Sequence, residues 1–244
     1  MPRLIWDKRG ERIYETGVEC GVIYPQNAFG EYPKGAVWNG LDVVTESPSG
    51  SEPSNTYADN KKYLSLISTE EYNATIEAYG YPGDFKDCLD SGVVMGGLFI
   101  GQQKKRIFGL SYKTIIGNDM DSNEHGYKLH LVYGCLASPP EKSYSSVNDS
   151  PEVITFSWEV TTTPVPFAGY RPISSIVLDS RKIIEWKLKL LEDILYGSDD
   201  TDARLPLPDE VFHIVTNQLL DSKSDALEDS FGDILLDNKK KGGI

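Results

Sequence analysis

Few residues in this 244-residue chain have the types and spacing of a catalytic or metal-binding site. His125 and His130 are five residues apart in a strand-rich region, so we expect their side chains on opposite faces of a strand, where they are poor joint metal ligands. The acidic run from Asp119 to Glu124 resembles the start of a calcium loop, but it lacks a glycine at the sixth position and a distal bidentate glutamate. A polar hairpin turn explains this run better.

Other signatures of chemistry are also missing from the sequence. The glycine-rich stretch at residues 92–101 lacks the Lys-Ser/Thr pair and the following helix of a phosphate-binding loop. Cys20, Cys88 and Cys135 are far apart and form no CxxC pair, which indicates neither a disulfide framework nor a zinc site. We therefore expect a protein that is not an enzyme and that uses no cofactor or metal.

The elements between Ile13 and about Thr163 are predicted to be strands separated by turns. In the last predicted strand, Phe156 and Trp158 alternate with Ser157 and Glu159, so one face is apolar and the other polar, as an antiparallel sheet with one buried face requires. The predicted strands cover residues 36–44, 63–67, 72–79, 107–116, 127–133 and 153–160.

One strong helix is predicted at about residues 181–196, capped by Asp179 or Ser180 and ended by Gly197. The sequence thus indicates a mainly β (α+β) fold, an antiparallel β-sandwich or barrel-like domain over residues 1–208 flanked by this α-helix. Residues 209–244 are predicted to be a C-terminal extension. It begins with a short amphipathic run, and its acidic part from Asp221 to Asp237 has too few apolar residues to fold alone.

A Ser-, Pro- and Gly-rich stretch at residues 46–60 is predicted to be a long inter-strand loop. It is longer than a hairpin turn needs, and loops of this length are usually functional or disordered. Pro48 and Pro53 stiffen it, so docking would cost it less entropy than it would cost a glycine chain.

The net charge of −13 disfavours a protein that grips nucleic acid through phosphate contacts. It allows a protein that encloses DNA without holding it. No apolar stretch approaches the ~20 residues that span a bilayer, and the charged N-terminus is unlike a signal peptide. We expect a protein made and assembled in a cytoplasm, with no membrane partner.

Several long stretches resemble the major tail proteins (tail-tube proteins) of long, non-contractile-tailed bacteriophages. The resemblance covers about Gly21 to Val211 and fades after Phe212. Its most distinctive parts are residues 38–41 (WNGL), 46–53 (ESPSGSEP), 57–64 (YADNKKYL), 75–79 (TIEAY), 126–134 (GYKLHLVYG), 148–152 (NDSPE), 156–159 (FSWE) and 161–165 (TTTPV).

The resemblance implies a structural virion protein. Six copies would close into a ring, and the rings would stack into the tail tube that conducts DNA, which passes through the lumen without specific binding. The partners would be further copies of the chain, the tape measure protein, the tail terminator and the tail-tip proteins. The location would be the virion tail, after assembly in the host cytoplasm.

Two groups of residues are candidates for assembly and conduction. The long loop is predicted to join one ring to the next, and two acidic strand positions are predicted to face the lumen. The candidate inter-ring residues are Glu46, Ser47, Pro48, Ser49, Gly50, Ser51, Glu52, Pro53 and Tyr57, and the candidate lumen residues are Glu77 and Glu159.

Two alternatives remain open at this level. The first is another phage ring or decoration protein, such as a tail terminator or a capsid decoration protein. The second is a carbohydrate-binding β-sandwich module with exposed tryptophans, although Trp38 and Trp158 lie in predicted strands, where core packing is the better expectation.

Overall fold

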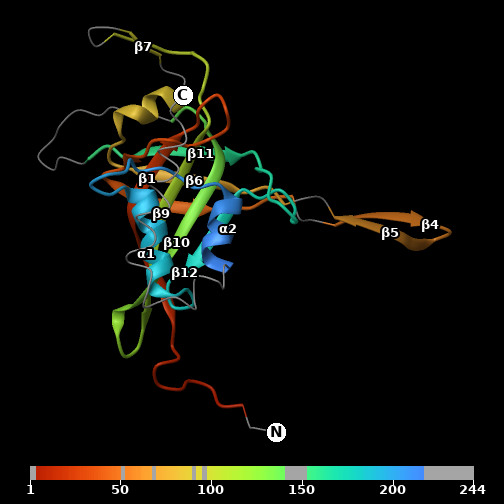
Figure 1. Ribbon diagram of the computed structural model, residues 1–244. Coiled ribbons are helices and arrows are strands. Elements are labelled where there is room, and N and C mark those ends of the chain that lie inside the picture. Colours follow the sequence, from red (N-terminus) through yellow and green to blue (C-terminus); the bar gives the residue numbers. More distant parts are fainter. Residues whose placement is uncertain are drawn as a thin grey trace, which may run out of the picture.

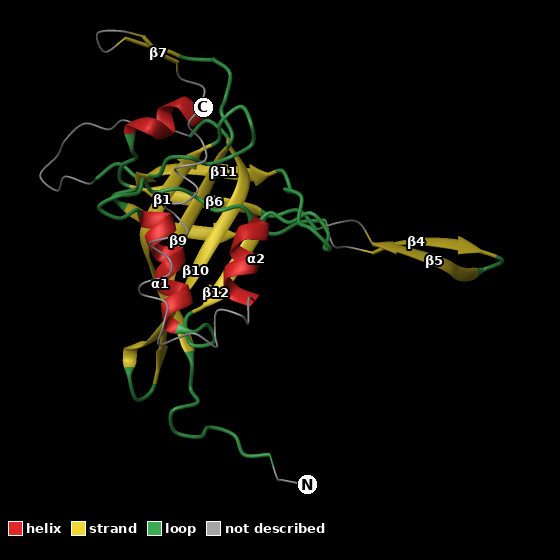
Figure 2. Cartoon of the chain, viewed as in Figure 1, coloured by secondary structure: helices red, strands yellow, loops and turns green. Residues whose placement is uncertain are grey.

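The computed structural model describes residues 4–50, 53–67, 70–89, 92–94, 98–140 and 153–216. It is mainly antiparallel β-structure with two α-helices over these residues (Figure 1 and Figure 2). The strands are β1 (Tyr14–Pro25), β2 (Ala36–Val37), β3 (Leu41–Glu46), β4 (Pro53–Ala58), β5 (Lys61–Ile67), β6 (Asn73–Ala78), β7 (Gly92–Val94), β8 (Leu98–Ile100), β9 (Phe108–Asn118), β10 (Ser122–Ala137), β11 (Phe156–Thr162) and β12 (Ser175–Asp179). The helices are the 3₁₀ helix η1 (Gly83–Cys88), α1 (Glu185–Tyr196) and α2 (Pro208–Thr216).

The main sheet has the strand order β2-β1-β9-β10-β11-β6-β3, and β12 pairs with β10 beside this path. All of these pairs are antiparallel. The far strand of this order, β3, comes back to β1, because a Cβ at Gly21 of β1 would lie 2.8 Å from Cδ2 of Leu41 in β3. The sheet is therefore rolled towards a barrel, and the predicted barrel-like β fold with a flanking helix is confirmed.

Two apolar cores lie on the two faces of the rolled sheet, because successive side chains of a strand point to opposite faces. In β1, Ile23 faces the inner core, while Val22 and Tyr24 face the outer core under the helices. The inner core holds Trp38, Ile76, Phe85, Phe108 and Trp158, among others. The outer core holds Tyr32, Leu129, Leu131, Tyr133, Leu191, Leu195 and Val211, among others.

Strand β10 serves both cores because a bulge at Gly134 shifts its alternation. Before the bulge it pairs with β12 through residues 128–132, and after it with β11 through residues 135–137. Gly134 has φ +63°, and a Cβ there would lie 2.1 Å from the Thr163 carbonyl oxygen, so only glycine fits. The bulge lets Val132 and Cys135 share the inner core although they are three residues apart.

Helix α1 packs on the outer face of the sheet through Leu188, Leu191 and Leu195, as its apolar stripe predicts. Its start differs from the expectation of about residue 181. The helix begins at Glu185, and its N-cap position, Ile184, makes no side-chain capping bond. Neither predicted cap serves the helix, because Asp179 and Ser180 both lie well before Glu185. The Asp179 oxygens bind the Arg181 guanidinium, at 2.9 and 2.8 Å, and the Ser180 hydroxyl oxygen accepts from the Tyr127 amide at 2.9 Å. Gly197 ends the helix with φ +82°, as expected.

The predicted strands are found with three changes, and β1 and β12 were not predicted. The strand expected at residues 153–160 begins only at Phe156. Residues 36–44 form two strands, because the chain turns at Gly40 (φ +79°) and β2 and β3 pair with different neighbours. Residues 63–67 belong to β5, which leaves the main sheet and pairs only with β4 within the described chain. The expected C-terminal extension starts with α2, whose Val211 is buried in the outer core. Residues 217–244 lie outside the described residues.

Candidate assembly surface

A two-stranded hairpin, β4–β5, projects from the body of the protein and is here called the arm (residues 53–67) (Figure 1). It turns at Asp59 and Asn60, both with positive φ (49° and 60°), which is the two-residue turn geometry that matches the twist of antiparallel strands. The prediction of a loop over residues 46–60 is therefore wrong for its second half, which forms the strand β4. The Ser, Pro and Gly content hid a strand whose partner, β5, follows directly after the turn.

The arm carries large apolar side chains that the body does not cover. Tyr57 is 67% exposed, Tyr63 75%, Leu64 46% and Leu66 57%. Leu64 and Leu66 pair with Thr56 and Ser54 and share one face, while Asn55 and Ser65, whose side chains hydrogen bond at 2.9 Å, share the other. An isolated two-stranded hairpin is marginally stable in water. An exposed apolar arm of this kind is typical of an element that is completed by a partner.

The base of the arm extends the main sheet. The Ser47 amide donates to Asn73 O at 2.8 Å, and Ser49 and Glu71 exchange two hydrogen bonds of 2.8 and 2.9 Å. Residues 46–50 thus run antiparallel beside residues 71–74, and the arm continues outward from them. Pro53 and Tyr57 lie in β4, Pro48 and Gly50 lie at the base, and Ser51 and Glu52 lie outside the described residues.

Glu46 differs from the other candidate inter-ring residues because its side chain turns back to the sheet. Its carboxylate accepts a 2.5 Å hydrogen bond from the Tyr112 hydroxyl of β9. Nδ1 of His130, on β10, lies 3.3 Å from the same Glu46 oxygen, but the two atoms are not aligned for a hydrogen bond. The electrostatic attraction between His130 and Glu46 therefore requires a protonated imidazole. The His130 ring stacks on Tyr112 at 4.5 Å between centroids, and its Nε2 contacts the Thr114 hydroxyl at 2.9 Å.

This cluster holds Glu46 in its ionised form. The neighbouring His130 and then the Tyr112 hydroxyl lower the pKa of the Glu46 carboxyl to about 2, against the opposing effect of burial. The contacts tie the end of β3, where the chain leaves for the arm, to two strands on the other side of the rolled sheet. Glu46 therefore fixes the root of the arm, a position that the sequence did not reveal.

The two candidate lumen residues come together on one polar face. In the β11–β6 pair, Ser157 lies opposite Glu77 and Glu159 opposite Thr75. These four side chains point away from the inner core, which takes Ile76, Trp158 and Val160 from the same strands. The structure thus places Glu77 and Glu159 on neighbouring positions of one outward face. That this face lines a lumen stays a prediction.

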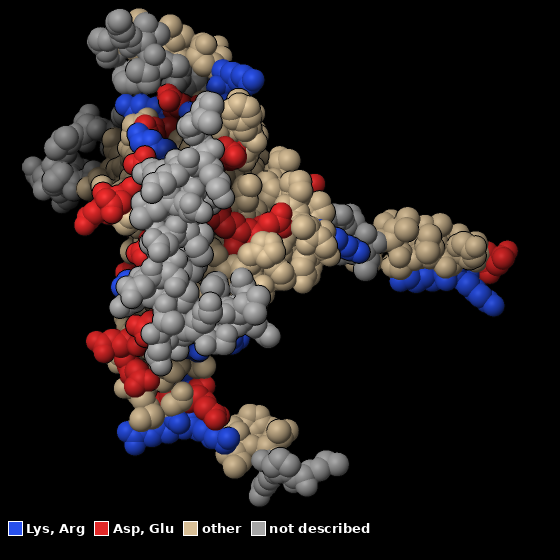
Figure 3. Space-filling model, in the orientation of Figure 1, with Lys and Arg blue, Asp and Glu red and all other residues tan. Residues whose placement is uncertain are grey.

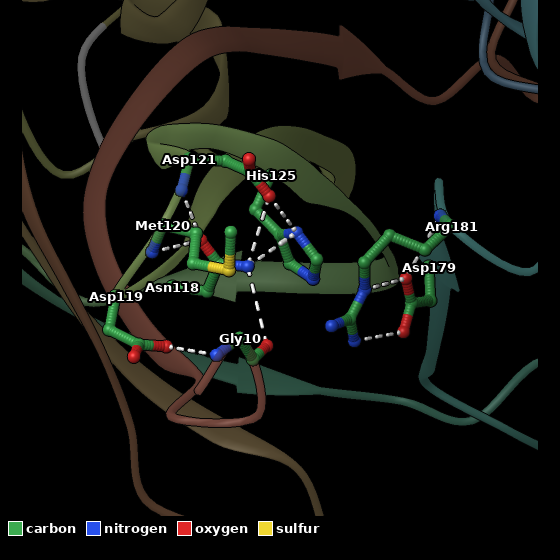
Figure 4. A network of polar contacts seen from close by, with 8 residues as sticks. All are labelled: Gly10, Asn118, Asp119, Met120, Asp121, His125, Asp179 and Arg181. Atoms are coloured by element: carbon green, nitrogen blue, oxygen red, sulfur yellow. Dashed lines mark hydrogen bonds and ion pairs between the residues drawn. The ribbon is translucent and has the colours of Figure 1, made fainter. Parts of the chain in front are cut away.

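At the tip of the β9–β10 hairpin a polar network fastens the N-terminal segment (Figure 4). The Gly10 amide donates to the Asp119 carboxylate at 2.9 Å, and the Asn118 amide group donates to Gly10 O at 3.4 Å. Asn118 also accepts from the Met120 amide at 3.0 Å and contacts Nδ1 of His125 at 3.1 Å. The acidic run at residues 119–124 is thus a hairpin turn, as expected, and it anchors residue 10.

The charged side chains are unevenly distributed over the face shown in Figure 3. Lys and Arg gather along one side of the arm, beside the N-terminal segment and on the upper part of the body, while Asp and Glu form several clusters on the body between them. Lys61 and Lys62 are the exposed lysines of the arm. An acidic body with local basic extensions is suited to contacts between copies of one chain.

The described residues include the metal-ligating, thiol and tryptophan side chains considered from the sequence. No group of three or more His, Cys, Asp or Glu side chains among them could hold a metal ion. The three cysteines are unpaired, and burial raises the pKa of the Cys88 thiol to about 12, which keeps it a neutral apolar side chain. Trp38 and Trp158 are 3% and 0% exposed, so neither is a sugar platform. Over the described part of the chain, no helix is long and apolar enough to cross a membrane.

Neither a known protein family nor a curated protein matches the sequence. Among solved structures, the chain is similar to a chain of the sheath–tube complex of an extracellular contractile injection system in its extended state. The TM-score is 0.30 and the identity 11%, over 71% of this chain and 93% of that chain. The likeness is weak and by itself carries no argument about function.

Proposed function

We propose that this chain is a structural subunit of a phage tail tube that assembles as stacked hexameric rings. The observation that carries the proposal is the arm, a hairpin that leaves the body and exposes Tyr57, Tyr63, Leu64 and Leu66. The sequence resemblance to major tail proteins described above supports the same assignment. The tape measure, terminator and tip proteins of the tail would be its further partners.

The arrangement of the strands is consistent with ring closure. Strand β12 pairs on one side only among the described residues, and its Val177 is 50% exposed. An uncovered strand edge is an aggregation hazard unless another strand or chain covers it. In a closed ring the next subunit would cover it, and a heterologous contact of this type closes after a fixed number of copies.

The acidic face with Glu77 and Glu159 is the candidate wall of the lumen. No lysine or arginine occurs in β6 or β11. A wall without cations would let DNA slide, because phosphate contacts with Lys and Arg are what hold DNA to proteins. A tube whose inner surface is neutral or basic would overturn this part of the proposal.

Electron microscopy of the purified protein tests the proposal. Tubes are expected for a tail-tube subunit, closed rings or trimers for a terminator or decoration protein, and monomers for a binding module. Monomers at high concentration, with no tubes even when tail-tip components are added, would contradict the tail-tube function.

The role of the arm is tested by two variants. In the first, residues 51–69 are replaced by a Gly-Ser turn that joins the paired base directly. In the second, Leu64→Ser and Leu66→Ser remove the apolar face. Both are expected to keep the melting temperature of the monomer, since the arm contributes nothing to either core, and to lose stacking. Asn55→Thr with Ser65→Thr, on the opposite face, is the matched control and should form tubes.

A further inference from the structure

The N-terminal segment, residues 4–9, exposes three large apolar side chains. Leu4 is 74% exposed, Ile5 65% and Trp6 77%. The segment projects away from the body of the subunit, beyond the tip of the β9–β10 hairpin (Figure 2). An apolar run of this kind next to a fixed anchor, Gly10, has the form of a docking peptide.

This segment cannot reach the opposite end of its own subunit. Gly10 is held at Asn118, the last residue of β9, while the far end of the subunit is marked by Gly109 near the start of that strand. Nine residues of strand at about 3.3 Å each separate the two ends by roughly 30 Å. Six extended residues before Gly10 span at most about 20 Å. Residues 4–9 can therefore reach a site at the far end only in another copy.

A pocket of about 310 Å³ lies at that far end. Its floor is Tyr32 and Leu205, which pack over Gly109, and Leu207, 40% exposed, forms part of its wall. Two carboxylates, Glu31 and Glu210, and the Arg204 guanidinium also line it. The lining thus combines an apolar surface with one net negative charge.

The charges of the two ends are complementary. Glu210 is neutralised by Arg204, with contacts of 2.5 and 2.7 Å, but Glu31 pairs with no cation among the described residues and accepts only the Asn27 side-chain amide, at 3.0 Å. Arg9, three residues after Trp6, likewise makes no ion pair within the described part of the chain. An apolar run followed by a free cation fits a pocket that combines an apolar surface with a free carboxylate.

We infer that residues 4–9 of one copy bind the pocket formed by Tyr32, Leu205 and Leu207 of the next copy along the strand direction, with Arg9 facing Glu31. The N-terminal segment and the pocket lie at opposite ends of one subunit. The contact is therefore heterologous and extends from ring to ring without closing. The inference rests on the proposed tube and adds a second link between rings beside the arm.

Cysteine cross-linking in assembled tubes tests this contact. In a Cys20→Ser background, which removes the exposed native thiol, Ile5→Cys and Leu207→Cys are introduced together. Oxidised tubes are expected to give a ladder of covalent multimers on a non-reducing gel. Each copy then carries one cysteine in the N-terminal segment and one beside the pocket, so each copy can be linked to two others. Each single variant, and Ile5→Cys combined with Val177→Cys, should give no ladder.

The outcomes separate this contact from the tube itself. Tubes that form without a ladder would overturn the docking of the N-terminal segment and leave the tube intact. If the wild type and the Cys20→Ser parent are both folded by circular dichroism yet form no tubes even when tail-tip components are added, the proposed function fails, and the inference fails with it. A charge exchange adds a second readout. Arg9→Glu and Glu31→Arg should each shorten the tubes, and the double variant should restore their length.

Discussion

Glu46 gives the sharpest quantitative prediction about the folded subunit. Its carboxyl has a pKa of about 2 in the folded protein against an ordinary value of 4.5. A difference of this size corresponds to about 3 kcal/mol of stabilisation once the carboxyl is ionised and His130 is protonated. Because the side chain is 40% exposed, water screens much of this, and we expect about 1–2 kcal/mol.

The sign of the pH dependence follows from the lowered pKa. The stabilisation is present above pH 4.5, the value of the unfolded chain, and is lost as the pH falls through about 2. By about pH 3, roughly half of it should be gone. Glu46→Gln keeps the size of the side chain and an acceptor for the Tyr112 hydroxyl, but it removes the charge.

Urea unfolding of the wild type and of Glu46→Gln between pH 7 and pH 3, under conditions that keep the subunit unassembled, measures the effect. The difference in unfolding free energy should be present at about pH 5, above the ordinary pKa of the carboxyl, and shrink as the pH falls towards 3. Glu71→Gln removes an exposed carboxylate near the same sheet edge and is the matched control, with a change within about 0.5 kcal/mol. A difference between wild type and Glu46→Gln that is absent at about pH 5, or equal at pH 5 and pH 3, would refute the assigned role of the cluster.

Three further predictions concern the body of the subunit. Trp158→Ala should cost about 3–5 kcal/mol in urea unfolding, since this side chain is fully buried against Trp38, Tyr81 and Phe85, whereas Trp6→Ala should cost less than about 0.5 kcal/mol. Gly134→Ala should cost more than about 3 kcal/mol because its Cβ meets the Thr163 carbonyl. Gly169→Ala, with a similar φ of +78° but open space, should cost only about 1–2 kcal/mol, and equal costs would contradict the steric explanation. Truncation after Thr216 should leave the thermal melting temperature unchanged, while truncation after Leu207 removes the buried Val211 with α2 and should lower it by several degrees.

Alternation and helical spacing were enough to identify the class of the fold. Ile76, Trp158 and Val160 were recognisable as core positions because every second residue of a half-buried strand must be apolar. The stripe of Leu188, Leu191 and Leu195 fixed the buried face of α1 in the same way. These are local signals, which need no knowledge of the strand partners.

The position of β5 could not be predicted from its own residues. Tyr63, Leu64 and Leu66 have the composition of a core strand, and only the tertiary structure shows that they stand outside both cores. The partner strand β4 was missed because Ser, Asn and Pro are poor strand formers. The Asp59-Asn60 pair was the available sequence signal. Asp and Asn tolerate positive φ values, and both residues have them in the turn that closes this hairpin.

The sequence by itself determined the alternating core strands, the amphipathic helix and an acidic chain without a catalytic or metal-binding pattern. The tertiary structure decided which distant residues meet. Glu46, Tyr112 and His130 come from three strands, and Gly10 and Asn118 are 108 residues apart. Such contacts depend on how the sheet rolls and where β10 changes partner at Gly134, and these are set by packing over the whole chain rather than by any local pattern.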